Sequence, residues 1–111
     1  MKLLFVETKH FTRRISDERW EDDLRELQQE LLSNPEKGPV ERGTGGLRKV
    51  RMRLRGRGKG KSSGARVHYL HVPHRDVIYM LFAYPKGEQA VLTDEQRKML
   101  RPLVDAFKHG R

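Results

Sequence analysis

The sequence contains no cysteine. A disulfide-stapled scaffold and a zinc site built on thiolates are therefore excluded. Apolar residues are also scarce, at 35% of the 111 residues, and charged residues make up another 35%. A chain of this length can bury one modest core but not two, so we expect a single domain over residues 1–111.

The beginning of the sequence has no long hydrophobic run. The apolar stretch from Leu3 to Val6 spans only four residues and is followed by Glu7. Such a stretch is too short for the core of a signal peptide or for a membrane-spanning helix. We therefore expect a soluble, cytoplasmic protein without a membrane partner.

Acidic residues are missing between Glu41 and Asp76, whereas eleven Lys and Arg lie between Arg42 and Arg75. These eleven residues carry +11, so the rest of the chain sums to −2 and the net charge of +9 arises in this window. Like charges concentrated in this way destabilise a compact protein, and a polyanion relieves the repulsion by releasing counterions. The sequence therefore predicts a nucleic-acid partner.

The first third of the chain predicts a strand and then a helix. Leu3 to Thr8 has the composition of a short strand. Ser16 can cap a helix that ends at Asn34-Pro35, because proline lacks the donor that a helix needs. Apolar residues recur on one face of this helix at Trp20, Leu24, Leu27 and Leu31. Its many acidic residues argue against contact with nucleic acid.

From Arg48 onward, apolar residues occur at every second position. Val50, Met52 and Leu54 alternate with Lys49, Arg51, Arg53 and Arg55, which predicts a strand with an apolar and a cationic face. A second strand over Ala65 to Val72 and a central, doubly covered strand over Val77 to Tyr84 follow through short connections. Such an order is typical of an antiparallel meander.

The last part of the chain predicts a helix. Thr93 and Gln96 have the spacing of a capping box, and the helix should run to about Lys108. We expect Pro102 to kink it. Its buried stripe should consist of Met99, Leu100, Leu103, Val104 and Phe107.

The strongest chemical constellation is cationic. Lys49, Arg51 and Arg53 share one strand face, and Arg66 comes from the next strand. Alternate residues of a strand lie about 6.5–7 Å apart, close to the spacing of successive phosphates. Cations on rigid elements can stabilise the charge that develops on a phosphate during cleavage. The same face also suits a protein that binds RNA without cutting it.

Other chemistry has weaker support. His68 and His71 are three residues apart in a strand and should face opposite sides, which argues against a joint acid–base role. No carboxylate or thiol lies near them, so we expect neither a metal nor a cofactor. Gly60-Lys61-Ser62 lacks the upstream glycine of a phosphate-binding P-loop.

Two residues lie at the exit of the central strand, Tyr84 and Lys86. Tyr84 could stack on a base, and Lys86 could neutralise the adjacent phosphate. The alternative is that Tyr84 belongs to the core and that Lys86 is a solvated turn residue. The sequence leaves both interpretations open.

Several motifs in order resemble those of the RelE/ParE superfamily of bacterial toxins, and of its HigB branch in particular. These are GTGGLRK at Gly43 to Lys49, a Gly/Lys-rich loop over 56–64, Gly64-Ala65-Arg66 at the start of a strand, and Tyr84-Pro85-Lys86. The resemblance covers almost the whole chain. It implies a small α+β domain, with an antiparallel sheet of about four strands, an N-terminal helical segment and a C-terminal helix.

The function that this resemblance implies is that of a type II toxin–antitoxin system toxin, a ribosome-dependent mRNA endonuclease. The RNA supplies its own 2′-hydroxyl as nucleophile, so no cofactor is needed. The implied partners are mRNA in the ribosomal A site, ribosomal RNA and an antitoxin with an acidic segment.

The motif positions also assign roles. Lys49 and Arg51 take the base and stabilising roles, Arg66 that of the transition-state arginine, and Tyr84 and Lys86 the region of the acid or stacking group. Because arginine hardly ever deprotonates, Lys49 is the better base of the first pair. We expect further contacts with RNA or ribosome from Arg48, Arg53, Arg55, Arg57, Lys59 and Lys61.

Two other functions remain as alternatives. A basic protein that binds RNA or the ribosome without catalysis would use the same strand face. A ParE-like toxin of the same fold would inhibit DNA gyrase instead.

Overall fold

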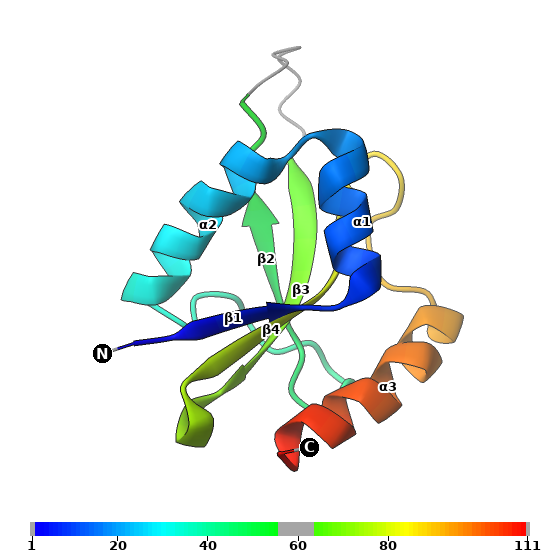
Figure 1. The fold of residues 1–111 in the computed structure, drawn as a ribbon. Coiled ribbons are helices and arrows are strands. Elements are labelled where there is room, and N and C mark those ends of the chain that lie inside the picture. The colour runs from blue at the N-terminus through cyan, green and yellow to red at the C-terminus, as the bar shows by residue number, and fades with distance from the viewer. Residues whose placement is uncertain (1, 56–63, 111) are drawn as a thin grey trace.

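The computed structural model describes residues 2–55 and 64–110. Along the chain it contains β1 (Leu4–Glu7), α1 (Lys9–Glu18), α2 (Glu21–Ser33), β2 (Arg48–Met52), β3 (Ala65–Val72), β4 (Val77–Pro85) and α3 (Asp94–Lys108). A 3-10 turn (Pro73–Arg75) joins β3 to β4. Three α-helices and a four-stranded sheet in these residues confirm the predicted α+β class (Figure 1).

The sheet is mixed, which corrects the prediction of an antiparallel sheet. Its strand order is β1-β4-β3-β2, and the pairs β2–β3 and β3–β4 are antiparallel as expected. β1, however, lies parallel to β4, with Leu4 opposite Val77. The meander was predicted from short links between consecutive strands, but β1 pairs with the last strand. No local pattern specifies the direction of so distant a pairing.

The predicted N-terminal helix is in fact two helices. α1 begins after Thr8, whose side chain accepts a hydrogen bond from the Phe11 backbone N–H, and ends at the left-handed residue Arg19. Ser16 lies inside α1 and is therefore not a cap. α1 was missed because only Phe11 and Ile15 are buried in it, and two apolar positions four residues apart give little periodic signal.

Helices cover the sheet on both faces (Figure 1). On one face, α1 and α2 pack against residues such as Val50, Met52 and Val67. On the other face, α3 packs against residues such as Leu70 and Tyr79. β4 contributes to both cores, which confirms that it is doubly covered, and β3 does so as well. Trp20 is buried with α2, as its helical spacing predicted.

The start of α3 confirms the predicted capping box between Thr93 and Gln96. Its buried stripe is narrower than predicted: Leu100 and Val104 are buried, but Met99 is 70% and Leu103 39% exposed. α3 thus contacts the sheet along one line of residues, and the flanking apolar positions face outward. The helix continues across Pro102.

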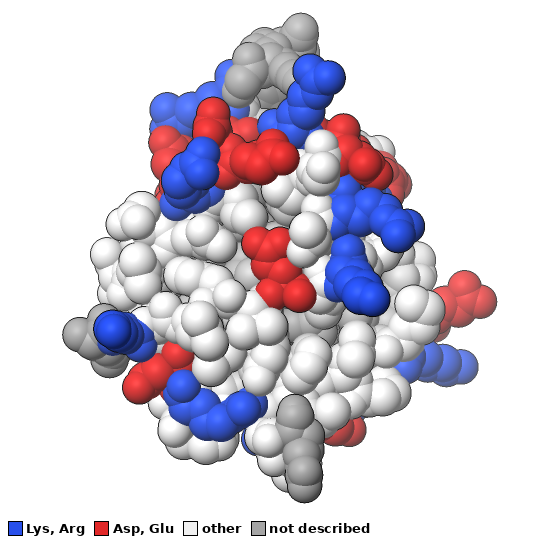
Figure 2. All heavy atoms as spheres, in the orientation of Figure 1, with Lys and Arg blue, Asp and Glu red and all other residues white. Residues whose placement is uncertain are grey.

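The outer surface of α1 and α2 carries charges of both signs. In Figure 2, Lys and Arg lie beside Asp and Glu near the turn that joins these helices, and uncharged residues cover most of the rest of this face. Within the part of the chain that the structure describes, no helix has the length and apolarity to span a bilayer. With its mixed charges, the surface of α1 and α2 differs from the cationic sheet face described next.

Candidate functional site

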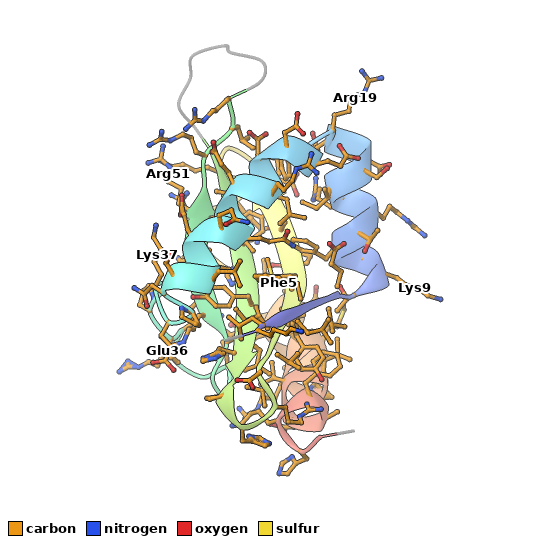
Figure 3. All side chains as sticks on the ribbon, turned by 60° about the vertical axis from the view of Figure 1, so that its left-hand side comes forward. Phe5, Lys9, Arg19, Glu36, Lys37 and Arg51 are labelled. Carbon is orange, nitrogen blue, oxygen red and sulfur yellow. The ribbon has the colours of Figure 1, made fainter. Side chains whose placement is uncertain are left out.

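The strand register aligns the candidate residues in two rows across the sheet. Arg51, Arg66 and Tyr84 form one row, and Lys49, His68 and Phe82 form the next. Directly opposed residues project from the same face of a sheet. Because Val50 and Met52 point to the core beneath α2, both rows lie on the α3 face. Arg51 points outward from the β2 side of the sheet (Figure 3).

The GTGG segment is a compact turn that holds the chain before β2. The buried Thr44 hydroxyl donates a hydrogen bond to the Glu41 carbonyl at 2.7 Å and accepts one from the Leu47 backbone N–H at 3.0 Å. The Glu41 backbone N–H donates to the Leu47 carbonyl at 2.8 Å. Gly45 has a φ of +82°, which favours glycine, and its carbonyl accepts a hydrogen bond from Lys108 of α3.

This turn places the carboxylate of Glu41 among the strand cations. Oε2 of Glu41 lies 3.6 Å from Nζ of Lys49, and Oε1 lies 3.0 Å from Nδ1 of His68. The Glu41 side chain is only 15% exposed. Sequence reasoning did not select Glu41. The available signal was its position, as the last acidic residue before the basic window and directly upstream of the turn.

His68 is fully buried beneath the cations. Its pKa is lowered to about 3, first because burial disfavours the charged ring and then because Lys49 and Arg97 repel it. The imidazole is therefore neutral at pH 7. Its contact with Glu41 is close but lacks the angle of a hydrogen bond, so it is a dipole–charge contact rather than an ion pair.

The other ring nitrogen of His68 meets Tyr84. Nε2 lies 3.1 Å from the Tyr84 hydroxyl. A carboxylate can only accept, so the ring proton is assigned to Nδ1, facing Glu41, and Nε2 accepts the hydrogen bond from Tyr84. Burial raises the pKa of the Tyr84 phenol, and the nearby Glu41 raises it further. Tyr84 is completely buried, so its ring does not present a stacking surface.

Arg66 has an unfilled hydrogen-bonding capacity. Its side chain is half-buried, and Nη1 is buried without an acceptor among the described residues. Buried guanidinium N–H groups normally have a partner, and planar anions such as phosphate suit them. Nη1 is therefore a hydrogen-bond donor that the described residues leave unsatisfied.

Arg97 is a further cation that the sequence prediction missed. It lies in the first turns of α3, 3.1 Å from Asp94, and its charge contributes to the lowered pKa of His68. Its helical position, three residues before the buried Leu100, was the only available hint. Arg97 brings a positive charge from the helix to the sheet face.

Two predicted residues lie at the rim of this cluster. Lys86 is exposed after β4, and its backbone N–H donates to the carbonyl of Gly64, just before β3. Arg53 is exposed after β2. Both follow the strand ends nearest to Arg66. Arg57, Lys59 and Lys61 lie outside the described residues.

The other predicted cations are not brought to this cluster. Arg48 lies on the α2 face, where it donates hydrogen bonds to the carbonyls of Gly38 and Glu36. The Arg55 side chain lies 3.3 Å from Glu26 of α2. His71 contacts Glu36, so it and His68 face opposite sides as predicted.

No protein-family model matches the sequence. Among residues 2–55 and 64–110, no three His, Asp or Glu side chains are grouped closely enough to hold a metal ion. The candidate site is the cationic cluster of Lys49, Arg51, Arg66 and Arg97. Glu41, His68 and Tyr84 lie beside or beneath this cluster.

Proposed function

We propose that this protein is the toxin of a type II toxin–antitoxin system and a ribosome-dependent mRNA endonuclease. The observation that carries the proposal is the unfilled Nη1 of Arg66, set in one row with Arg51 and beside Lys49. This arrangement suits a single phosphodiester. The motif order from GTGGLRK to Tyr84-Pro85-Lys86, which resembles that of HigB-type toxins, supports the same function.

The cations act on the charge that develops when the 2′-hydroxyl attacks the adjacent phosphate. Arg66 and Arg51 project from paired strands, so their guanidinium groups are held by a rigid element. Donors that are oriented before the reaction stabilise the transition state without reorganisation, and losing one typically costs a factor of about 10²–10³ in rate. In this proposal the ribosome presents the mRNA in its A site, and Lys86 and Arg53 at the rim contact the RNA backbone.

An antitoxin follows from the same electrostatics. A face with several cations and one partly buried carboxylate binds RNA through its phosphates, so a neutralising partner should cover it with acidic side chains. The toxin would act in the cytoplasm, where ribosomes translate.

The test is primer extension on a reporter mRNA in a reconstituted translation system, with wild type, Arg66→Ala and Arg13→Ala. Arg13→Ala is the matched control, because it removes one exposed arginine from α1 on the opposite side of the sheet. We expect discrete, ribosome-dependent cuts from wild type and Arg13→Ala. Arg66→Ala should cut at least about 100-fold more slowly.

Other outcomes distinguish the alternatives. Intact mRNA together with blocked translation would indicate a non-catalytic ribosome-binding protein. Intact mRNA and normal translation, with inhibited supercoiling by gyrase in a parallel assay, would indicate a ParE-like activity. Either result would refute the endonuclease.

A further inference from the structure

The candidate site contains few groups that can accept a proton. Arginine hardly ever deprotonates, and the ammonium of Lys49 faces a carboxylate. His68 is neutral, but it is completely buried and its two nitrogens face Glu41 and Tyr84. Cleavage by a 2′-hydroxyl needs an acceptor for the hydroxyl proton. Among the described residues of this cluster, Glu41 is the acceptor that reaches the surface.

We propose that Glu41 is a catalytic residue, the general base that takes the proton of the attacking 2′-hydroxyl, and that His68 is the residue that positions it. This inference rests on the proposed endonuclease. It assigns the base role to a loop carboxylate in place of Lys49, which then acts as a cation beside the phosphate.

The two carboxylate oxygens of Glu41 have different surroundings. Oε1 is buried, 3.0 Å from Nδ1 of His68, so the imidazole dipole holds this oxygen inward. Oε2 lies 3.6 Å from Nζ of Lys49, a side chain that is 27% exposed. A phosphate bound by Lys49 and Arg66 therefore brings its neighbouring 2′-hydroxyl toward Oε2.

The reaction step balances without a further reactant. The O2′–H bond breaks, the proton moves to Oε2 of Glu41, and the O2′ electron pair forms the new bond to phosphorus. The P–O5′ bond breaks, and O5′ leaves with its electron pair and takes a proton from water. The products are a 2′,3′-cyclic phosphate and a 5′-hydroxyl end.

The titratable groups that face Glu41 come from the strands packed around it. Lys49 reaches it from β2, His68 from β3 and Tyr84 from β4, and Arg97 of α3 faces His68. A general base acts only in its deprotonated form. The cleavage rate should therefore fall on the acidic side of the pH profile.

The experiment is single-turnover cleavage of mRNA on programmed ribosomes by wild type, Glu41→Gln and Glu36→Gln. The saturating rate should fall about 100-fold or more in Glu41→Gln, as is usual when a general base is lost. The half-saturating concentration should stay the same or fall, because a negative charge is removed near the phosphate. Glu36→Gln is the control, since it removes a carboxylate that pairs with Arg48 on the other sheet face.

Glu41→Asp keeps the carboxylate and tests whether the acidic limb of the pH profile depends on it. We expect it to retain the acidic limb of the pH profile, and Glu41→Gln to lose that limb. Tighter binding by Glu41→Gln with an unchanged saturating rate would show that Glu41 is only a counter-ion, and would overturn the inference.

Two further results keep the test decisive. A wild-type profile without an acidic limb would also overturn it, even if Glu41→Gln fails to fold. Absence of any cleavage by wild type would instead refute the proposed endonuclease itself.

Discussion

At the scale of single residues, the site combines exposed cations with a neutral, buried layer. Glu41, His68 and Tyr84 form a chain of contacts of 3.0 and 3.1 Å beneath Lys49 and Arg66. A neutral histidine suits this position because a positive charge on the buried ring would be repelled by Lys49 and Arg97. The chain therefore fixes the carboxylate without adding charge.

Stability should depend on pH through His68. Its folded pKa of about 3 is below the unfolded value of 6.5, so the unfolded state binds a proton that the folded state does not. Above pH 6.5 His68 is neutral in both states and does not lower the unfolding free energy. As the pH falls from about 6.5 toward 3, the unfolding free energy decreases. Between pH 7 and pH 5 we expect this group to cost about 2 kcal/mol of unfolding free energy.

Urea unfolding of wild type and His68→Gln at pH 7 and pH 5 measures this term. Glutamine cannot take up a proton in this range, so the variant should lose about 2 kcal/mol less than wild type over the interval. Equal losses in both proteins would mean that His68 is not held neutral in the fold.

At the scale of elements, the turn between α2 and β2 positions Glu41, the proposed general base. The Thr44 hydroxyl bonds to groups at both ends of the turn, and Lys108 of α3 bonds to the Gly45 carbonyl. Glu41 is thus held from within the turn, and the turn itself is held against α3. A surface loop gains in this way the rigidity that a catalytic group requires.

Replacing Thr44 with valine should destabilise the protein. The Leu47 N–H loses a buried acceptor and the Glu41 carbonyl loses a donor, which together should cost about 1–3 kcal/mol in urea unfolding. Thr44→Ser keeps the hydroxyl and should recover most of this loss. Thr12→Val removes the exposed α1 hydroxyl that donates to Glu7, and it should cost less, about 0.5 kcal/mol.

The same variants connect the turn to the proposed reaction. Where Thr44→Val remains folded, its saturating cleavage rate should fall, because Glu41 is no longer fixed. A destabilised variant with the wild-type rate would show that the turn supports the fold alone.

At the scale of the whole molecule, the two sides of the sheet differ in their charges. α1 and α2 carry cations paired with acids, such as Arg14 with Glu18 and Arg25 with Asp22. The α3 face of β2 and β3 carries Lys49, Arg51 and Arg66 around one carboxylate. This division directs a polyanion to the α3 face of β2 and β3.

RNA binding should therefore depend steeply on salt, with a contribution from each cation of this face. A fully 2′-O-methylated oligonucleotide serves as the ligand, because it binds without offering a nucleophile. Arg51→Ala should reduce the magnitude of the slope of log K against log salt by about 0.7, the value for one single-stranded phosphate contact. Arg13→Ala on α1 should leave the slope unchanged, and equal slopes for both variants would contradict this orientation of the RNA.

The fold was largely predictable where the pattern was local. The alternation in β2, the apolar β4 and the capping box of α3 all hold in the structure. The prediction was wrong where the apolar pattern did not report burial. α1 buries too few residues to show a period, and Met99 and Leu103 repeat with the buried stripe but lie beyond the edge of its contact with the sheet.

The sequence by itself determined that this protein has a cationic strand face and an acid-free window around it, because charge and alternation are properties of neighbours along the chain. It also placed Arg66 beside that face through the order of the strands. Only the tertiary structure decided that Glu41 meets Lys49 and His68, and that Tyr84 lies beneath them. These contacts depend on strand register and on the conformation of a turn. Both are set by packing between segments that are distant in sequence.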